Sequence, residues 1–247
     1  MKLTPSTIVA FGIVASLATS VSAGQAPAAR PAGGERFEVT SIKAVRPTLV
    51  RTVDALKKGD TAAAEEAFEA YDTGWNGIEV YINTRDRDMY NELEKNYQTK
   101  IEEGLKASKP DVAALLANAQ AMLAKYDEML ALVEKSAPLN RLYDDVARLR
   151  IERSHLREVT PALKAGNLAK ARKSFTAFDD NWDNIEDLVK ARSRESYDTI
   201  EKGMVTIERQ LMPAKPDTDA AIATVTEVMT EYNKIVNQIT KDARDAK

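Results

Sequence analysis

An internal repeat constrains the fold of this chain more than any other feature of its sequence. A segment that starts at Lys57 aligns without gaps on a segment that starts at Lys164, and about 16 of 43 aligned positions are identical. The only two tryptophans of the chain, Trp75 and Trp182, align with each other. Self-similarity at a fixed spacing is typical of a duplicated supersecondary unit. The sequence therefore predicts two copies of one folding unit.

Each copy has the spacing of amphipathic helices rather than the alternation of β-strands. Apolar residues recur at steps of three and four, which is the period of one helix face. In the first copy this stripe consists of Ala64, Phe68, Tyr71, Trp75, Ile78 and Ile82, and in the second of Ala171, Phe175, Phe178, Trp182, Ile185 and Val189. We expect each stripe to lie on one continuous helix and to face the core.

Helix ends can also be read from the sequence. Gly59 and Gly166 stand where a preceding helix must stop, because glycine readily takes the left-handed backbone conformation of a C-cap. Asp60 and Asn167 follow directly and are good N-caps for the next helix. Short connections between amphipathic helices favour antiparallel up-and-down packing.

We therefore predict an all-α fold of two tandem antiparallel four-helix bundles related by internal duplication. The first bundle repeat covers residues 35–137 and the second covers residues 138–247, with the division near Ala137-Pro138. One long fused bundle is the alternative.

The beginning of the chain predicts export from the cytoplasm. Lys2, a short apolar run and the small residues that end at Ala23 form the pattern of a signal peptide over residues 1–23. Residues 24–34 are rich in alanine, proline and glycine and read as a flexible linker. The chain has no cysteine and no later long apolar run, so we expect a soluble periplasmic protein that does not span the membrane.

Several function classes are not expected from the sequence. The net charge is -3, and no basic patch is interleaved with aromatic residues, so nucleic acid is not an expected partner. There is no glycine-rich phosphate loop, nucleophile elbow or triad, and we expect no enzymatic activity. The single histidine, His155, forms an H-x-x-E pattern with Glu158 that resembles the motif of imelysin-like periplasmic proteins, but Arg153 replaces the glycine of that motif. A metal role and an exposed helix residue are both open for His155.

The strongest candidate site is a pair of glutamates that recurs in both copies. Glu79 precedes the turn between two predicted helices by about seven residues, and Glu94 follows that turn by about eight, so the two should lie at similar heights on antiparallel neighbours. Glu186 and Glu201 repeat this spacing. Carboxylates that meet beside a core can hold a hard cation or Fe(III).

An alternative for the same acids is structural. Partly buried carboxylates need partners, and the sequence offers arginines close to both turns. These arginines are Arg85, Arg87, Arg192 and Arg194.

Two runs of the first copy resemble a known family. The runs A-Y-D-T-G-W-N-G-I-E (70–79) and T-R-D-R-D-M-Y-N-E-L-E (84–94) are similar to the extracytoplasmic helical domain of bacterial high-affinity iron permeases. The likeness covers about residues 45–135 and, more loosely, residues 141–240. The transmembrane helices of that family, with their R-E-G-L-E motif, are missing, so the resemblance implies a free-standing, duplicated version of the external domain.

The resemblance implies iron as the ligand and an inner-membrane iron permease as the partner. By position it implies that Glu79, Glu94, Glu186 and Glu201 are the metal ligands. The first hypothesis is therefore a periplasmic iron-associated binding protein that holds iron or hands it over to such a permease. The second is a metal-free periplasmic helical interaction or sensor-like module, in which the acids are structural.

Overall fold

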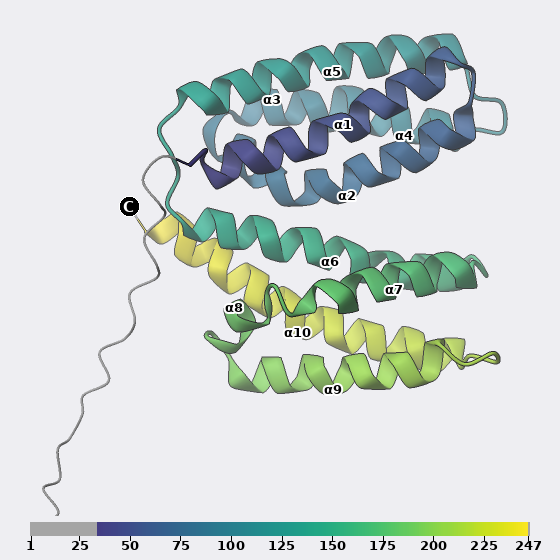
Figure 1. Ribbon diagram of the computed structural model, residues 1–247, viewed down its shortest axis with the longest axis vertical. Helices are drawn as coiled ribbons and strands as arrows, with labels where there is room; N and C mark the ends of the chain where they lie inside the picture. The colour runs from purple at the N-terminus through teal and green to yellow at the C-terminus, as the bar shows by residue number, and fades with distance from the viewer. Residues whose placement is uncertain (1–33, 247) are drawn as a thin grey trace, which may run out of the picture. The chain divides into compact units, whose positions relative to one another are not determined.

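The described part of the chain, residues 34–246 of a computed structural model, consists of helices joined by short loops (Figure 1). The predicted all-α class is therefore confirmed for these residues. The predicted signal peptide and nearly all of the linker lie outside them. In chain order the elements are α1 (Phe37–Lys57), α2 (Thr61–Arg85), α3 (Arg87–Asn91), the π-helix η1 (Glu92–Gln98), α4 (Thr99–Leu105), α5 (Val112–Lys135), α6 (Leu142–Lys164), α7 (Leu168–Trp182), α8 (Glu186–Lys190), α9 (Arg194–Leu211) and α10 (Thr218–Asp245).

The helix ends that were predicted from local sequence are confirmed. Gly59 and Gly166 follow α1 and α6 with φ angles of 73° and 70°, which only glycine takes without strain. The side chain of Asp60 accepts a hydrogen bond from the backbone N–H of Ala63 at the start of α2. Asn167 caps α7 in the same way.

The first half of the described chain is a group of helices from α1 to α5. Helix α1 packs against α2 and α5, and the rod formed by α3, η1 and α4 packs against α5 and α2. Tyr71, Trp75 and Tyr126 are fully buried in its core. The hydroxyl of Tyr126 donates a hydrogen bond of 2.7 Å to the carbonyl oxygen of Ile42, which joins α5 to α1.

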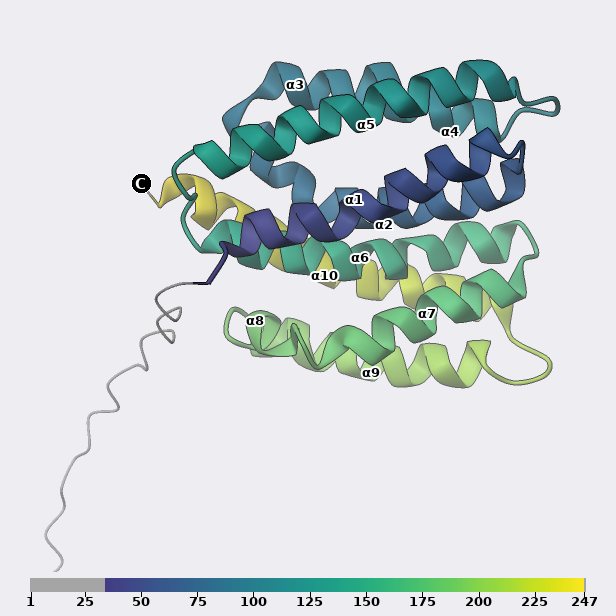
Figure 2. The ribbon, with the colours of Figure 1, turned by 45° about the horizontal axis from the view of Figure 1, so that its top comes forward.

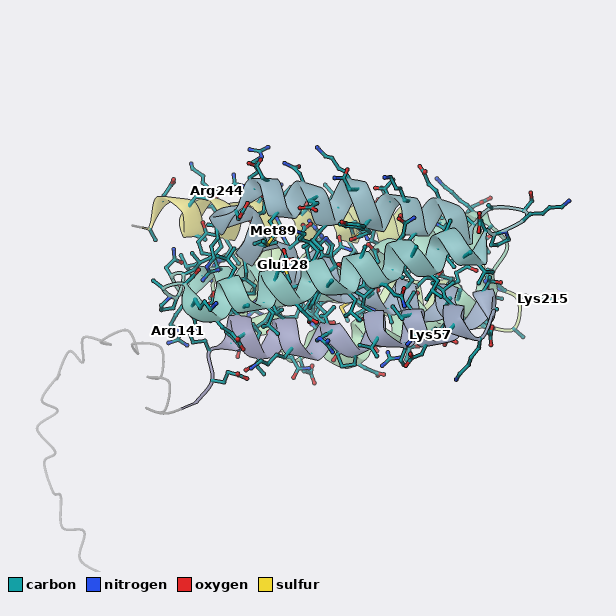
Figure 3. All side chains as sticks on the ribbon, turned by 90° about the horizontal axis from the view of Figure 1, so that it is seen from above. Lys57, Met89, Glu128, Arg141, Lys215 and Arg244 are labelled. Atoms are coloured by element: carbon teal, nitrogen blue, oxygen red, sulfur yellow. The ribbon has the colours of Figure 1, made fainter. Side chains whose placement is uncertain are left out.

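The second half repeats this arrangement of contacts. Helix α6 packs against α7 and α10, and α9 packs against α10 and α8. The hydroxyl of Tyr232 donates a hydrogen bond of 2.8 Å to the carbonyl oxygen of Leu149, so α10 is joined to α6 as α5 is joined to α1. In Figure 3, Arg141 and Arg244 lie at one end of the helices and Lys57 and Lys215 at the other. Because Arg141 precedes α6 and Arg244 lies in the last turn of α10, these two helices run antiparallel.

Two details differ from the predicted helices. The second apolar stripe is not on one helix, because α7 ends at Trp182 and α8 begins only at Glu186. The predicted helix that carries Glu94 is not a regular α-helix, because it contains the π-helix η1, in which Gln98 is buried and Tyr97 is only partly buried.

Helices α2 and α6 connect the two halves and lie side by side in both views (Figure 1 and Figure 2). Gly77 of α2 permits this contact, because a Cβ at this position would lie 2.8 Å from the carbonyl oxygen of Ala147. Residues Glu35–Lys247 accordingly form one unit by their contacts. The predicted division near Ala137-Pro138 falls in the loop between α5 and α6 and stays a prediction. None of the described helices is long and apolar enough to cross a membrane.

Candidate functional site

Both predicted glutamates of the first half lie beside one stacked aromatic pair. The rings of Trp75 and Tyr90 are 6.3 Å apart and nearly parallel. The indole Nε1–H of Trp75 donates a hydrogen bond of 2.6 Å to Glu94 of η1. The side chain of Tyr90 lies beside Glu79 of α2, and burial and the Glu79 and Glu94 carboxylates raise the pKa of its hydroxyl. The structure thus brings Glu79 and Glu94 to the same Trp–Tyr pair.

The second half has the same contacts between equivalent residues. Trp182 and Tyr197 stack with ring centroids 6.3 Å apart. The indole Nε1–H of Trp182 donates a hydrogen bond to Glu201 of α9. The hydroxyl of Tyr197 donates a hydrogen bond of 3.1 Å to Glu186 of α8. We call each set of Trp, Tyr and two Glu side chains an indole–carboxylate cluster.

In the first cluster, Glu79 forms an ion pair with an arginine from the other half of the chain. The Nη1 atom of Arg150 on α6 lies 2.8 Å from a carboxylate oxygen of Glu79, and both side chains are largely buried. Burial raises the pKa of Glu79 from its ordinary value, while the positive charge of Arg150 lowers it and the nearby negative charge of Glu94 raises it. The Glu79 carboxylate is therefore held by a guanidinium rather than by solvent.

The second cluster has no such ion pair. Among the described residues, no lysine or arginine forms a salt bridge with Glu186 or Glu201. Two cations instead lie against the ring of Tyr197, with the Lys190 nitrogen 4.9 Å and the Arg194 guanidinium 5.3 Å from its centre. In the first cluster, helix α6 of the second half packs on α2 beside Glu79. Among the described helices, none of the first half packs on α8 or α9 to a similar extent.

The four arginines that the sequence offered as structural partners of the glutamates do not pair with them, so this prediction is wrong. Arg85 forms a buried salt bridge of 2.6 Å with Glu38 of α1. Arg194 pairs with Asp198 on its own helix. Neither Arg87 nor Arg192 forms a salt bridge with a predicted glutamate. The cation that does pair, Arg150, lies 71 residues from Glu79, and no local pattern in the sequence connects the two.

Each cluster offers two carboxylates and no third acidic ligand. Among residues 34–246, no group of three or more His, Cys, Asp or Glu side chains is close enough to hold a metal ion. Asp72, which shares a face of α2 with Glu79, instead accepts a hydrogen bond of 2.7 Å from Gln98 and pairs with Arg157. A cation at either cluster would need water or a hydroxyl group to complete its ligand shell.

A groove of about 980 Å³ between α2, α4, α6 and α7 was not predicted from the sequence, because it arises from the packing of the two halves. His155 and Glu158 line it, and burial lowers the pKa of His155, which is then neutral near pH 7. The Lys170 nitrogen lies 2.8 Å from Glu69 of α2 and 3.7 Å from Glu158 of α6. The charges of the groove are therefore largely paired with one another.

No protein-family model matches the chain, and searches of curated proteins and of solved structures find no match either. The resemblance to the external domain of iron permeases stays a prediction. The function is therefore argued from the clusters themselves.

Proposed function

We propose that this chain is a non-catalytic, periplasmic binding protein that holds a hard cation, iron, at its indole–carboxylate clusters. It consists of two tandem antiparallel four-helix bundles that arose by duplication. Iron bound at the clusters is passed on to an iron permease of the inner membrane. The metal, the compartment and the permease are taken from the sequence pattern and the family resemblance.

One observation supports this proposal above the others, namely that both halves keep the same two glutamates beside the same stacked Trp–Tyr pair. A protein without a metal site would need carboxylates at the positions of these four glutamates only if they stabilised the fold. Two carboxylates close to one another repel, and a cation between them relieves that repulsion. Among the described residues no arginine or lysine pairs with Glu186 or Glu201, so this pair is the better candidate for a metal ion.

The chemistry of the pair suits weak and reversible binding. Hard cations take oxygen ligands, so a site without cysteine or histidine can still bind Fe(III). Two carboxylates give a modest affinity, and the Tyr197 hydroxyl or water would complete the shell. Because the carboxylates must be ionised, binding weakens as the pH falls and protons compete with the metal.

Titration of the protein with Fe(III)-citrate, and with Ga(III)-citrate as a redox-inert mimic, tests this proposal. Wild type should bind reversibly at pH 7, and Glu79→Gln/Glu186→Gln should lose most of that binding. Glu195→Gln, which changes an exposed glutamate of α9, is the matched control and should bind like wild type. Circular dichroism would verify that every variant is folded. Equal binding by the double variant and wild type would contradict the proposal.

A metal-free helical interaction or sensor-like module is the second candidate. It is supported by the indole N–H and tyrosine O–H groups that already bind Glu94, Glu201 and Glu186, and by the ion pair between Glu79 and Arg150. In this case the clusters orient helices and need no ligand. The titration separates the two candidates, because here neither wild type nor any variant binds the metal.

A further inference from the structure

Glu152 of α6 is a carboxyl group inside the second half without a hydrogen-bond partner for one of its oxygens. Its Oε2 atom is buried and accepts no hydrogen bond. It lies three residues after Leu149, whose carbonyl oxygen binds the Tyr232 hydroxyl. Burial of a carboxylate without a partner is unfavourable, because the charged form loses its hydration.

The first half has an apolar residue at the equivalent position. There the Tyr126 hydroxyl binds the carbonyl oxygen of Ile42, and the residue three positions later is Val45. Val45 is 8% exposed and packs directly against Gly74 of α2. The same place in the same arrangement of helices is thus filled by a valine in one half and by a glutamate in the other.

The surroundings of Glu152 offer it no compensating charge. From α10 the phenol of Tyr232 faces it, and burial and the nearby Glu152 carboxylate raise the pKa of that phenol well above its ordinary value, so it stays neutral. On α6 itself, Arg153 binds Asn233 instead, and burial lowers the pKa of His155.

The charged groups named on the other neighbouring helices give Glu152 no positive partner either. On α2, Glu79 pairs with Arg150. On α7, Arg172 binds the carbonyl oxygens of Leu211 and Pro213, and Asp179 interacts with other acids. Burial alone raises the pKa of Glu152 from 4.5 to about 7.

We propose that Glu152 is a pH-sensitive switch: its protonated form allows α6 to pack tightly on α7 and α10, and its ionisation loosens this packing. The switch acts on the second half only, because Val45 cannot ionise. Its direction follows from linkage. The folded state binds the proton more tightly than the unfolded state, so the stabilisation is complete below about pH 4.5 and is lost as the pH rises through about 7.

Thermal unfolding of wild type and Glu152→Gln between pH 4.5 and 8.5 tests the switch. Glutamine imitates the protonated carboxyl, so the melting temperatures should agree at pH 4.5 and Glu152→Gln should melt higher by roughly 5 °C at pH 8.5. Glu158→Gln, on the same helix and bordering the groove, is the matched control and should show no such pH-dependent difference. A difference between Glu152→Gln and wild type that stays constant with pH would overturn the proposal.

Two measurements on the wild-type protein keep the test independent of how the variants fold. The ¹³C chemical shift of the Glu152 carboxyl should titrate near pH 7, and a midpoint near 4.5 would also overturn the proposal. Hydrogen exchange should show that amide protection in α6 and α10 falls between pH 5.5 and 8, after correction for intrinsic rates, while that of α1 and α5 does not. An equal fall in both halves would contradict a switch confined to the second half.

Discussion

Gly77 of α2 and Ala147 of α6 lie so close together that a Cβ on Gly77 would be 2.8 Å from the Ala147 carbonyl oxygen. A carbonyl in the middle of a helix cannot turn aside, and the Cβ would also lie even closer to the Cγ1 atom of Ile151, a β-branched side chain with little rotamer freedom in a helix. The contact between the two halves is therefore set by a residue without a side chain.

We expect Gly77→Ala to destabilise the protein by about 1–3 kcal/mol, as overpacking of a close helix contact does. Alanine is the better helix former by about 1 kcal/mol, so an isolated helix would become more stable. Urea unfolding measures the difference. Asn83→Ala, at an exposed position of the same helix, should change the free energy of unfolding by less than about 0.5 kcal/mol. A more stable Gly77→Ala protein would show that the two helices can move apart freely.

Gly59→Ala and Gly166→Ala should each lower the free energy of unfolding by about 1–2 kcal/mol. Both glycines have a left-handed φ, and a Cβ at either position would meet no atom within 4 Å, so the whole cost lies in the backbone. Gly34→Ala is the control, because it adds a Cβ to equally open space at a residue without a left-handed φ. It should leave the free energy of unfolding unchanged. Chemical denaturation of the three variants checks this prediction. An unchanged free energy of unfolding in Gly59→Ala or Gly166→Ala would contradict it.

Arg150→Met should raise the pKa of Glu79 further, because the guanidinium is the main influence that lowers it. A carboxyl whose folded pKa is raised contributes stability at low pH that is lost as the pH rises. The variant should therefore be destabilised by about 2 kcal/mol at pH 8 and much less at pH 4, where Glu79 is protonated. Urea unfolding at the two pH values gives both free energies.

Arg194→Met is a suitable control for this prediction, since it removes an arginine that pairs with Asp198 on an exposed helix face. Its effect should be below about 1 kcal/mol at either pH. Equal destabilisation of Arg150→Met at pH 4 and pH 8 would mean that Arg150 acts by packing and not by its charge on Glu79.

The features that could be predicted from the sequence are those that neighbouring residues decide. The left-handed caps at Gly59 and Gly166 and the N-caps at Asp60 and Asn167 depend on backbone freedom and on side chains within one turn. The approach of Glu79 to Glu94 could also be expected, because a single turn between two helices sets their relative height.

Only the tertiary structure decided the rest, because it depends on contacts between residues far apart in the chain. Helix α2 continues past Trp75 to Arg85, whereas α7 stops at Trp182, although both carry the same apolar stripe. The Arg150 partner of Glu79 and the burial of the Glu152 Oε2 atom follow from where α6 packs, and no local spacing determines that packing. Helix periodicity specifies which face is apolar, but the neighbour that covers each face is chosen by the close fit of the whole core.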